Sequence, residues 1–341
     1  MLIYLILGSL LSIGIIISLF SPDKELIHFG KQETQPLRAL LAIGIILTHT
    51  GYPPFWGWGW AIVSEFFFLS AYGLIISYRK KGEGYLQGFL RNRMLSVLAP
   101  FIIALLFWQL YLLMWGPGGG YYTSHLAQFR LGDPCIILPS SWFIFAIILV
   151  YLMFYWIAKI FKDAGIIVWM FSVSVVLAIV LFLFLNIKYN FGSQWFISSA
   201  GLIEGSLVAY YENRIREWIK SHKVLSLSLS LFSLVAIYII GLHTQYGYVL
   251  LNALFPLIVL LLIYVLGSVN IKMLNYLGLI SLEIYLMQGI VTAILRWDYG
   301  DSLGAVSYTI LSIVFSIMLA SILSIIKKPI LSWFKNSNSK N

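Results

Sequence analysis

Long apolar runs separated by short polar connections recur along nearly the whole chain. A helix needs roughly 20 apolar residues to cross a hydrocarbon core of about 30 Å. Backbone groups in lipid must be hydrogen-bonded within their own segment, so these runs predict an all-α, polytopic membrane helical bundle of about eleven spans. The predicted helices cover residues 1–20, 36–52, 55–78, 94–115, 141–161, 165–187, 195–211, 223–242, 248–268, 274–295 and 303–326.

The composition agrees with a chain that lies mostly in lipid, since 60% of its 341 residues are hydrophobic and only 10% are charged. These proportions exclude an ordinary soluble domain. The single cysteine, Cys135, has no partner for an intrachain disulfide, and we interpret it as a packing residue. The sequence contains no Cys or His pair with zinc-ligand spacing and no glycine-rich nucleotide fingerprint, so we expect no metal and no tightly bound cofactor.

Basic residues are distributed unevenly between the two predicted sides of the membrane. All of the 22 Lys and Arg residues except Arg130, Lys188 and Arg296 fall in alternate connections or in the C-terminal tail. Basic residues accumulate in cytoplasmic connections, so this distribution predicts an outer N-terminus and a cytoplasmic C-terminus. The net charge of +9 then reflects topology, and we expect the lipid bilayer and no nucleic acid as a partner.

The second predicted helix carries Arg38 and His49, which are eleven positions apart. Eleven steps of about 100° bring the two side chains to within roughly 20° of one helix face, about 16 Å apart along the axis. With Arg38 at the cytoplasmic edge, His49 lies in the outer half of the membrane. One interpretation is a snorkelling arginine and an interfacial histidine. The other is catalysis, because histidine exchanges protons near neutral pH and suits a general base.

Further ionisable residues follow in the next two predicted helices. Glu65 lies within an apolar span, where an ionisable group is costly and is therefore a functional candidate, although a structural hydrogen bond explains it equally well. Arg91 and Arg93 belong to the most basic inner connection. Topology alone explains their charges, but arginines also suit the oxygens of phosphate groups.

In their order along the chain, these motifs resemble the acyltransferase-3 family of membrane-bound bacterial acyltransferases, which commonly O-acetylate cell-surface glycans. The resemblance covers residues 37–326 as a ten-helix acyltransferase domain. It leaves residues 1–20 as an extra N-terminal transmembrane helix, 21–36 as a cytoplasmic linker and 327–341 as a basic cytoplasmic tail. The motifs are Arg38-x10-His49, the segment 65–70, Arg91-x-Arg93, Ser141-Trp142-Phe143 and the segment 278–286.

The resemblance implies transfer of an acetyl group from acetyl-CoA to a hydroxyl of a cell-surface polysaccharide or its lipid-linked precursor, in the bacterial plasma (inner) membrane. It implies that His49 acts as general base or acyl relay, that Arg38 and Glu65 help to build its site, and that Arg91 and Arg93 meet the phosphates of the acyl-CoA donor. The expected partners are acyl-CoA and a glycan or glycolipid acceptor.

The chain departs from the family pattern at one position. A histidine often follows the segment 278–286 in the family, whereas this chain has Gln288. Counted from the inner ends of their helices, Gln288 and His49 reach similar depths, so we expect an amide in place of that imidazole. The candidates for an acceptor or oxyanion site are Gln288, Glu283, Ser281 and Trp142.

A transporter or flippase for an acyl or glycan intermediate is the alternative function. In that hypothesis, ionisable residues within the spans line a polar path. The sequence shows no inverted internal repeat of the kind that many secondary transporters contain, which favours the acyltransferase. The residues of such a path are Arg38, His49, Glu65, Glu204 and Glu283.

Overall fold

The computed structural model describes residues 30, 33–51, 58–115, 133, 135, 137–243, 245–266, 271–299 and 302–336. Every regular element in these ranges is a helix, which confirms the predicted all-α class. The predicted helix 1–20 and most of the predicted linker 21–36 lie outside the described residues. The helices are α2 Gln35–His49, α3 Gly59–Lys81, α4 Phe89–Trp115, α6 Trp142–Phe161, α7 Ala164–Tyr189, α8 Ala200–Ser221, α9 Lys223–His243, α10 Gln245–Leu266, α11 Lys272–Leu279, α12 Ser281–Tyr299 and α13 Ala305–Asn336, with short 3-10 helices η1 Gly82–Leu86 and η3 Ser193–Trp195.

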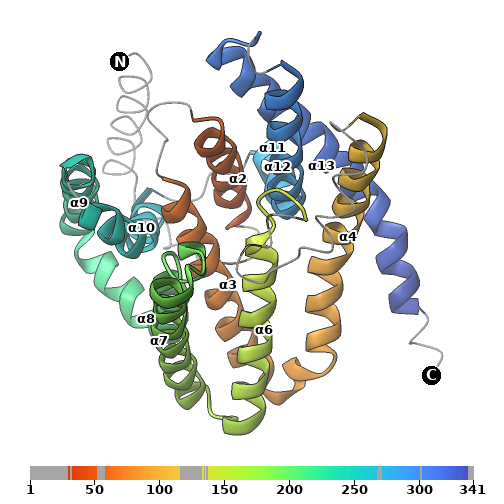
Figure 1. Ribbon diagram of the computed structural model, residues 1–341. Helices are drawn as coiled ribbons and strands as arrows, with labels where there is room; N and C mark the ends of the chain where they lie inside the picture. Colours follow the sequence, from red (N-terminus) through yellow and green to blue (C-terminus); the bar gives the residue numbers. More distant parts are fainter. Residues whose placement is uncertain are drawn as a thin grey trace.

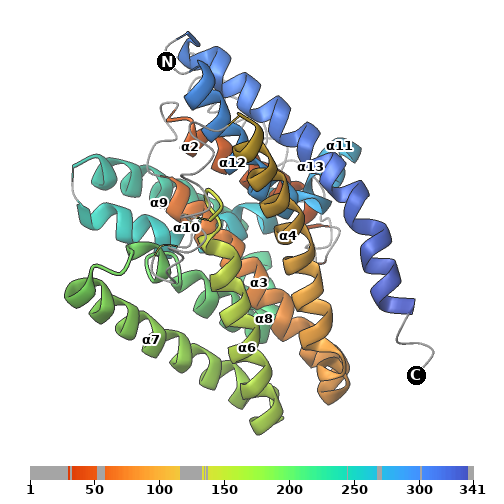
Figure 2. The same ribbon diagram turned by 45° about the vertical axis from the view of Figure 1, so that its right-hand side comes forward.

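Five helices in the described part of the chain are long and apolar enough to cross a membrane, namely α3, α4, α6, α7 and α13. A sixth span results if α11 and α12 are taken together, while α2 and the apolar parts of α9 and α10 are shorter. The chain is therefore a multi-pass membrane protein, and the total of eleven spans stays a prediction. Among the five, α3 is the most buried, and it lies at the centre of the bundle in Figures 1 and 2.

Contacts between neighbouring helices show which of them run in the same direction. The pairs α2–α3, α4–α6 and α12–α13 are antiparallel, whereas α3, α6 and α8 run parallel. This arrangement agrees with helices that cross the membrane alternately. The contacts are Gly44–Ile62 and Thr48–Gly59 for α2–α3, Phe101–Phe145 and Phe89–Phe154 for α4–α6, Thr292–Tyr308 and Glu283–Lys327 for α12–α13, Phe67–Phe143 and Tyr78–Phe154 for α3–α6, and Ser64–Gly201 and Phe68–Gly205 for α3–α8.

The predicted single helix over residues 274–295 is wrong, because the chain bends by 73° between α11 and α12. Gly278 near the end of α11 lies directly against the backbone carbonyl of Gln35, where a side chain on residue 278 would collide. This close contact holds α11 across the start of α2, and the chain leaves the helix at Ile280 before α12 begins. The bend therefore comes from packing between helices that are far apart in sequence.

Two helix ends differ from the prediction for a common reason. α4 begins at Phe89, five residues before the predicted start at residue 94, and so includes Arg91 and Arg93. α13 continues to Asn336 and includes the first ten residues of the predicted tail 327–341. In both places charged residues continue a helix, since long basic side chains reach water from the end of a span.

The crossing of α3 and α8 depends on two glycines, Gly201 and Gly205. A side chain at either position would collide with the α3 backbone, at Ser64 and at Phe68 respectively. Two small residues four positions apart allow helix backbones to approach closely in membrane proteins. This contact fixes the position of Glu65, which is fully buried on α3 between these two points.

Candidate functional site

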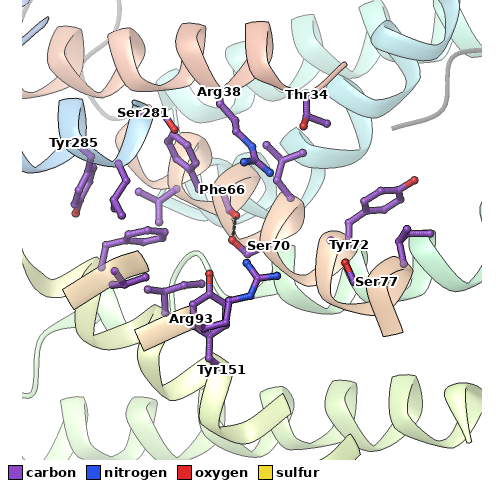
Figure 3. A pocket seen from close by; sticks show the side chains of 18 of the residues that line it. Thr34, Arg38, Phe66, Ser70, Tyr72, Ser77, Arg93, Tyr151, Ser281 and Tyr285 are labelled. Carbon is purple, nitrogen blue, oxygen red and sulfur yellow. Dashed lines mark hydrogen bonds between the residues drawn. The ribbon is translucent and has the colours of Figure 1, made fainter. Parts of the chain in front are cut away.

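A cavity of about 510 Å³ lies between α2, α3, α4, α6 and the start of α12. Its α3 wall includes Val63, Phe66, Ser70, Gly73, Ser77 and Lys80, which follow one another at alternating steps of three and four residues. Such steps place side chains along one helix face. Figure 3 shows the side chains that line this space.

Arg38 on α2 and Arg93 on α4 both line this cavity, and Figure 3 shows their guanidinium groups pointing into the same space from opposite helices. Among the described residues, no carboxylate forms an ion pair with either of them. Arg93 Nη2 donates a hydrogen bond to Tyr85 Oη at 2.6 Å, and its guanidinium lies 5.3 Å from the centre of the Tyr151 ring. Two partly buried positive charges without a negative partner make the cavity suited to an anionic ligand.

Arg91 does not share this position with Arg93. It is exposed and does not line the cavity. Two residues that are two positions apart on a helix point about 200° apart, so only one of them can face a given space. The structure therefore pairs Arg93 with Arg38, and the role of Arg91 in donor binding stays a prediction.

A smaller hollow of about 350 Å³ lies on the other side of Arg93, between η1 and the first turns of α4. Its lining is mostly polar and includes Lys81, Gln87, Asn92 and Ser96. Arg93 borders both spaces, because it lines the cavity as well as the hollow. An extended anionic ligand could thus contact Arg93 from either side.

His49 and Gln288 are in direct contact, although the predicted similarity of their depths was counted along a single helix 274–295 that the structure breaks at Ile280. His49 Nδ1 lies 2.7 Å from Gln288 Oε1. His49 is exposed at the last position of α2, whereas Gln288 on α12 is fully buried. Gln288 Nε2 has no hydrogen-bond partner within the described ranges. A titratable ring and an amide with a free donor group therefore lie side by side.

This histidine lies just beyond one end of the cavity. Neither His49 nor Gln288 lines the cavity, but Tyr285, less than one turn before Gln288, does. The cavity also reaches Val63, whose neighbour Ile62 contacts Gly44 on α2. Gly44 precedes His49 by five residues, which is about 7.5 Å along a helix axis. This end of the cavity is therefore the one that lies nearest to His49.

The family model of acyltransferase-3, described as an acyltransferase domain, matches residues 37–325. The chain belongs to this family. No curated protein and no solved structure matches it. The match covers the helices that build both the cavity and the His49–Gln288 pair. The predicted division of the chain into an N-terminal helix, a linker, a domain of residues 37–326 and a tail stays a prediction.

The acyltransferase-3 motif residue Glu65 lies apart from both features. It is fully buried and does not line the cavity, and neither of its carboxylate oxygens has a hydrogen-bond partner in the described part of the chain. Glu204 on α8 is close enough to act on it electrostatically. The structure therefore places Glu65 at the α3–α8 crossing, and its predicted part in the His49 site stays a prediction.

The other three candidates for an acceptor or oxyanion site occupy separate places. Ser281 lines the cavity at the first position of α12. Glu283 is buried and forms an ion pair with Lys327 on α13. Trp142 begins α6 and packs against Trp60, with 5.8 Å between the ring centres. Of the four candidates, only Gln288 contacts His49.

Sequence reasoning missed Ser70, Lys80 and Tyr151, all of which line the cavity. A signal for the first two was present, because Ser70, Gly73, Ser77 and Lys80 form a small and polar stripe on one face of an apolar helix. Tyr151 lies inside the apolar run of α6, and nothing in the sequence distinguishes it from a packing residue. Its position beside Arg93 depends on the contact between α4 and α6.

Cysteine and metal chemistry receive no support from the described residues. Burial raises the pKa of the Cys135 thiol, which disfavours the nucleophilic thiolate. No group of three or more His, Cys, Asp or Glu residues in the described ranges could hold a metal ion. Among the described residues, those available for chemistry beside this end of the cavity are therefore His49 and Gln288.

Proposed function

We propose that this acyltransferase moves an acetyl group from acetyl-CoA to a hydroxyl of a cell-surface polysaccharide or its lipid-linked precursor. The family supports membrane acyl transfer. The observation that carries the proposal is the cavity itself, which has two arginines without carboxylate partners and ends beside an accessible histidine. An acyl-CoA has the matching chemistry, because its phosphates are several bonds away from its thioester.

The donor binds with its charged end near Arg38, Arg93 and Lys80. The nucleotide of the donor binds in the polar hollow beyond Arg93, which Lys81 and Asn92 line. The uncharged arm then follows the α3 wall toward Phe66 and Phe143, which are apolar lining residues. This orientation brings the thioester to the end of the cavity that is nearest to His49.

His49 acts as general base in direct transfer. Its ring takes the proton from the acceptor hydroxyl as the oxygen attacks the thioester carbonyl carbon. The new C–O bond forms, and the carbonyl oxygen gains negative charge that the free Gln288 Nε2 donor stabilises. The C–S bond then breaks, and the proton passes from His49 to the leaving sulfur of CoA. An acyl-histidine relay is the alternative, in which the same thioester first acylates the ring.

The transporter hypothesis finds less support. A transported molecule needs a continuous polar path, and the ionisable residues assigned to it do not share one space. Arg38 lines the cavity, whereas Glu65 lies at the α3–α8 crossing and Glu283 is paired with Lys327. The described residues therefore favour a binding cavity with a reaction site at its end.

The test uses purified full-length protein in lipid nanodiscs with acetyl-CoA and a hydroxyl-bearing glycolipid acceptor. We expect release of free CoA thiol and a matching acetyl mass on the acceptor. His49→Ala should lower turnover by about 10²- to 10⁴-fold, the usual contribution of a general base, without loss of folded protein, because the ring is exposed at a helix end. Near-normal turnover by this variant would contradict the role of His49.

Mass spectrometry of surface glycans from cells with and without the protein would identify the acceptor.

A further inference from the structure

The contact between His49 and Gln288 bears on which nitrogen of the His49 ring carries the proton. Gln288 presents its carbonyl oxygen to His49 Nδ1 at 2.7 Å. A carbonyl oxygen can only accept a hydrogen bond, so this contact is a hydrogen bond in the tautomer whose Nδ1 carries the hydrogen. A neutral imidazole has one N–H group, and Nε2 therefore keeps its lone pair.

We propose that Gln288 fixes the tautomer and the orientation of the His49 ring. It leaves Nε2 as the nitrogen that removes the proton from the acceptor. This inference rests on the proposed function, because it assigns the base within that site. An aspartate has the corresponding task beside the histidine of hydrolase triads. A neutral amide orients the ring in the same way but stabilises the protonated ring less than a carboxylate would.

The backbone around Gln288 is held firmly enough for this task. Gly289 lies against the carbonyl of Pro139, where a side chain would collide. Tyr285 Oη donates a hydrogen bond to the Ser140 carbonyl at 2.6 Å. The turn that contains Pro139 and Ser140 thus contacts α12 on both sides of Gln288, and the amide is presented to His49 from a fixed helix.

The amide orientation also leaves a donor for the reaction. With Oε1 engaged by His49, Gln288 Nε2 is buried without a partner among the residues that the structure describes. A buried donor that lacks a partner costs free energy until a ligand oxygen meets it. One amide would then orient the base through its oxygen and face the thioester oxygen through its nitrogen.

The charged surroundings of the ring make the inference testable by substitution. Arg296, further along α12, is the charged group that acts electrostatically on His49. Within the described ranges, no carboxylate is hydrogen-bonded to the ring. Gln288→Glu would keep an acceptor oxygen at Nδ1 and add a negative charge. Gln288→Met would remove the acceptor while filling a similar volume.

The experiment measures imidazole nitrogen resonances of full-length protein labelled with 15N-histidine in nanodiscs. The chain has five histidines, and the spectrum of His49→Ala identifies the signal of interest by its loss. We expect His49 in the native protein to be protonated at Nδ1. Gln288→Met should shift the ring toward the Nε2-protonated form. Thr292→Val is the matched control, because among the described residues its hydroxyl donates only to the backbone carbonyls of Gln288 and Gly289, and it should leave the tautomer unchanged.

Kinetics supply a second readout that a purely structural role would not change. We expect Gln288→Met to lower kcat by about 10- to 100-fold, because it removes both the acceptor at Nδ1 and the donor for the thioester oxygen, with little change in the KM for acetyl-CoA because the arginines of the cavity are untouched. Gln288→Glu should keep the tautomer and move the acidic limb of the kcat profile to higher pH, since the added carboxylate favours the protonated ring.

Two outcomes would overturn the inference. One is a native His49 ring protonated at Nε2, and the other is a tautomer that Gln288→Met leaves unchanged. A separate result would contradict the proposed function, namely a His49→Ala variant that keeps its turnover. In that case the tautomer result would still stand as a statement about the contact.

Discussion

Arg38 on α2 and Arg93 on α4 point into one cavity from opposite walls, and no carboxylate in the described ranges pairs with either of them. Like charges that share a partly buried space repel each other, so this arrangement costs stability when the cavity is empty. Binding of a phosphate-bearing donor would relieve the repulsion. The pair therefore connects donor binding with the stability of the bundle.

Replacing Arg93 by Gln should raise the KM for acetyl-CoA by about 10-fold or more, because a hydrogen bond to a charged group contributes roughly 1.5–3 kcal/mol. Arg91→Gln is the matched control, since Arg91 is exposed and lies outside the cavity. Its KM should change much less. The measurement is steady-state kinetics at low ionic strength, where phosphate attraction is least screened.

The same comparison has a stability readout. Without donor, removal of the repulsion with Arg38 should offset the loss of the Arg93 contacts with Tyr85 and Tyr151, so Arg93→Gln should melt close to the native protein. Added acetyl-CoA should stabilise the native protein more than this variant. Equal KM increases for Arg91→Gln and Arg93→Gln would mean that the two charges act from outside the cavity, contrary to the assignment.

Gly205→Leu should destabilise the protein by about 1–3 kcal/mol or prevent its folding, because a side chain there collides with the α3 backbone at Phe68. Gly73→Ala is the control in the same bundle, since a methyl group at residue 73 meets no atom within 4 Å. It should keep or slightly raise the melting temperature, as alanine favours a helix over glycine. Fluorescence-monitored thermal unfolding in detergent would compare the two. Similar melting temperatures for both variants would contradict the close α3–α8 crossing.

Lys327→Met should destabilise the protein by about 3–5 kcal/mol, because it leaves the buried Glu283 carboxylate without its positive partner. The double variant Glu283→Gln with Lys327→Met should recover most of that loss, since neither buried charge remains. A double-mutant cycle of thermal stabilities gives the coupling between the two residues. Additive losses in the cycle would show that the ion pair contributes nothing.

The two substrates are expected to enter from opposite sides of the membrane. Basic residues mark the predicted cytoplasmic side, and His49 lies about 16 Å from Arg38 toward the other side. In sealed proteoliposomes of known orientation, acetyl-CoA added on the basic side should acetylate an impermeant acceptor enclosed on the other. Reaction only when both impermeant substrates share the basic side would disprove this arrangement.

Apolar periodicity predicted the helices well where a span is bounded by polar connections, as for α6 and α7. It failed at Ile280, because residues on both sides are equally apolar and the bend depends on contact between Gly278 and Gln35. It also placed the start of α4 too late, since Arg91 and Arg93 read as a connection although they are helical.

The candidate site was predictable as far as it depends on depth along single helices. The spacing of Arg38 and His49 needed only the rise of a helix, whereas the contact between His49 and Gln288 depends on the bend at Ile280 and on how α2 and α12 meet. The pairing of Arg93 with Arg38 depends on how α2 and α4 face each other, which no single-helix pattern contains. The same is true of the ion pair between Glu283 and Lys327.

The close crossing of α3 and α8 has a consequence for how the chain enters the membrane. α8 carries Glu204 and Glu212 and is not among the helices that are apolar enough to cross on their own. The insertion machinery recognises each segment by its hydrophobicity as it is synthesised, and α8 offers a weak signal. We therefore expect its retention to depend on docking to α3, which is synthesised earlier. Gly201 and Gly205 would therefore act during membrane insertion as well as in the folded protein, because they allow the weakly hydrophobic α8 to pack against α3.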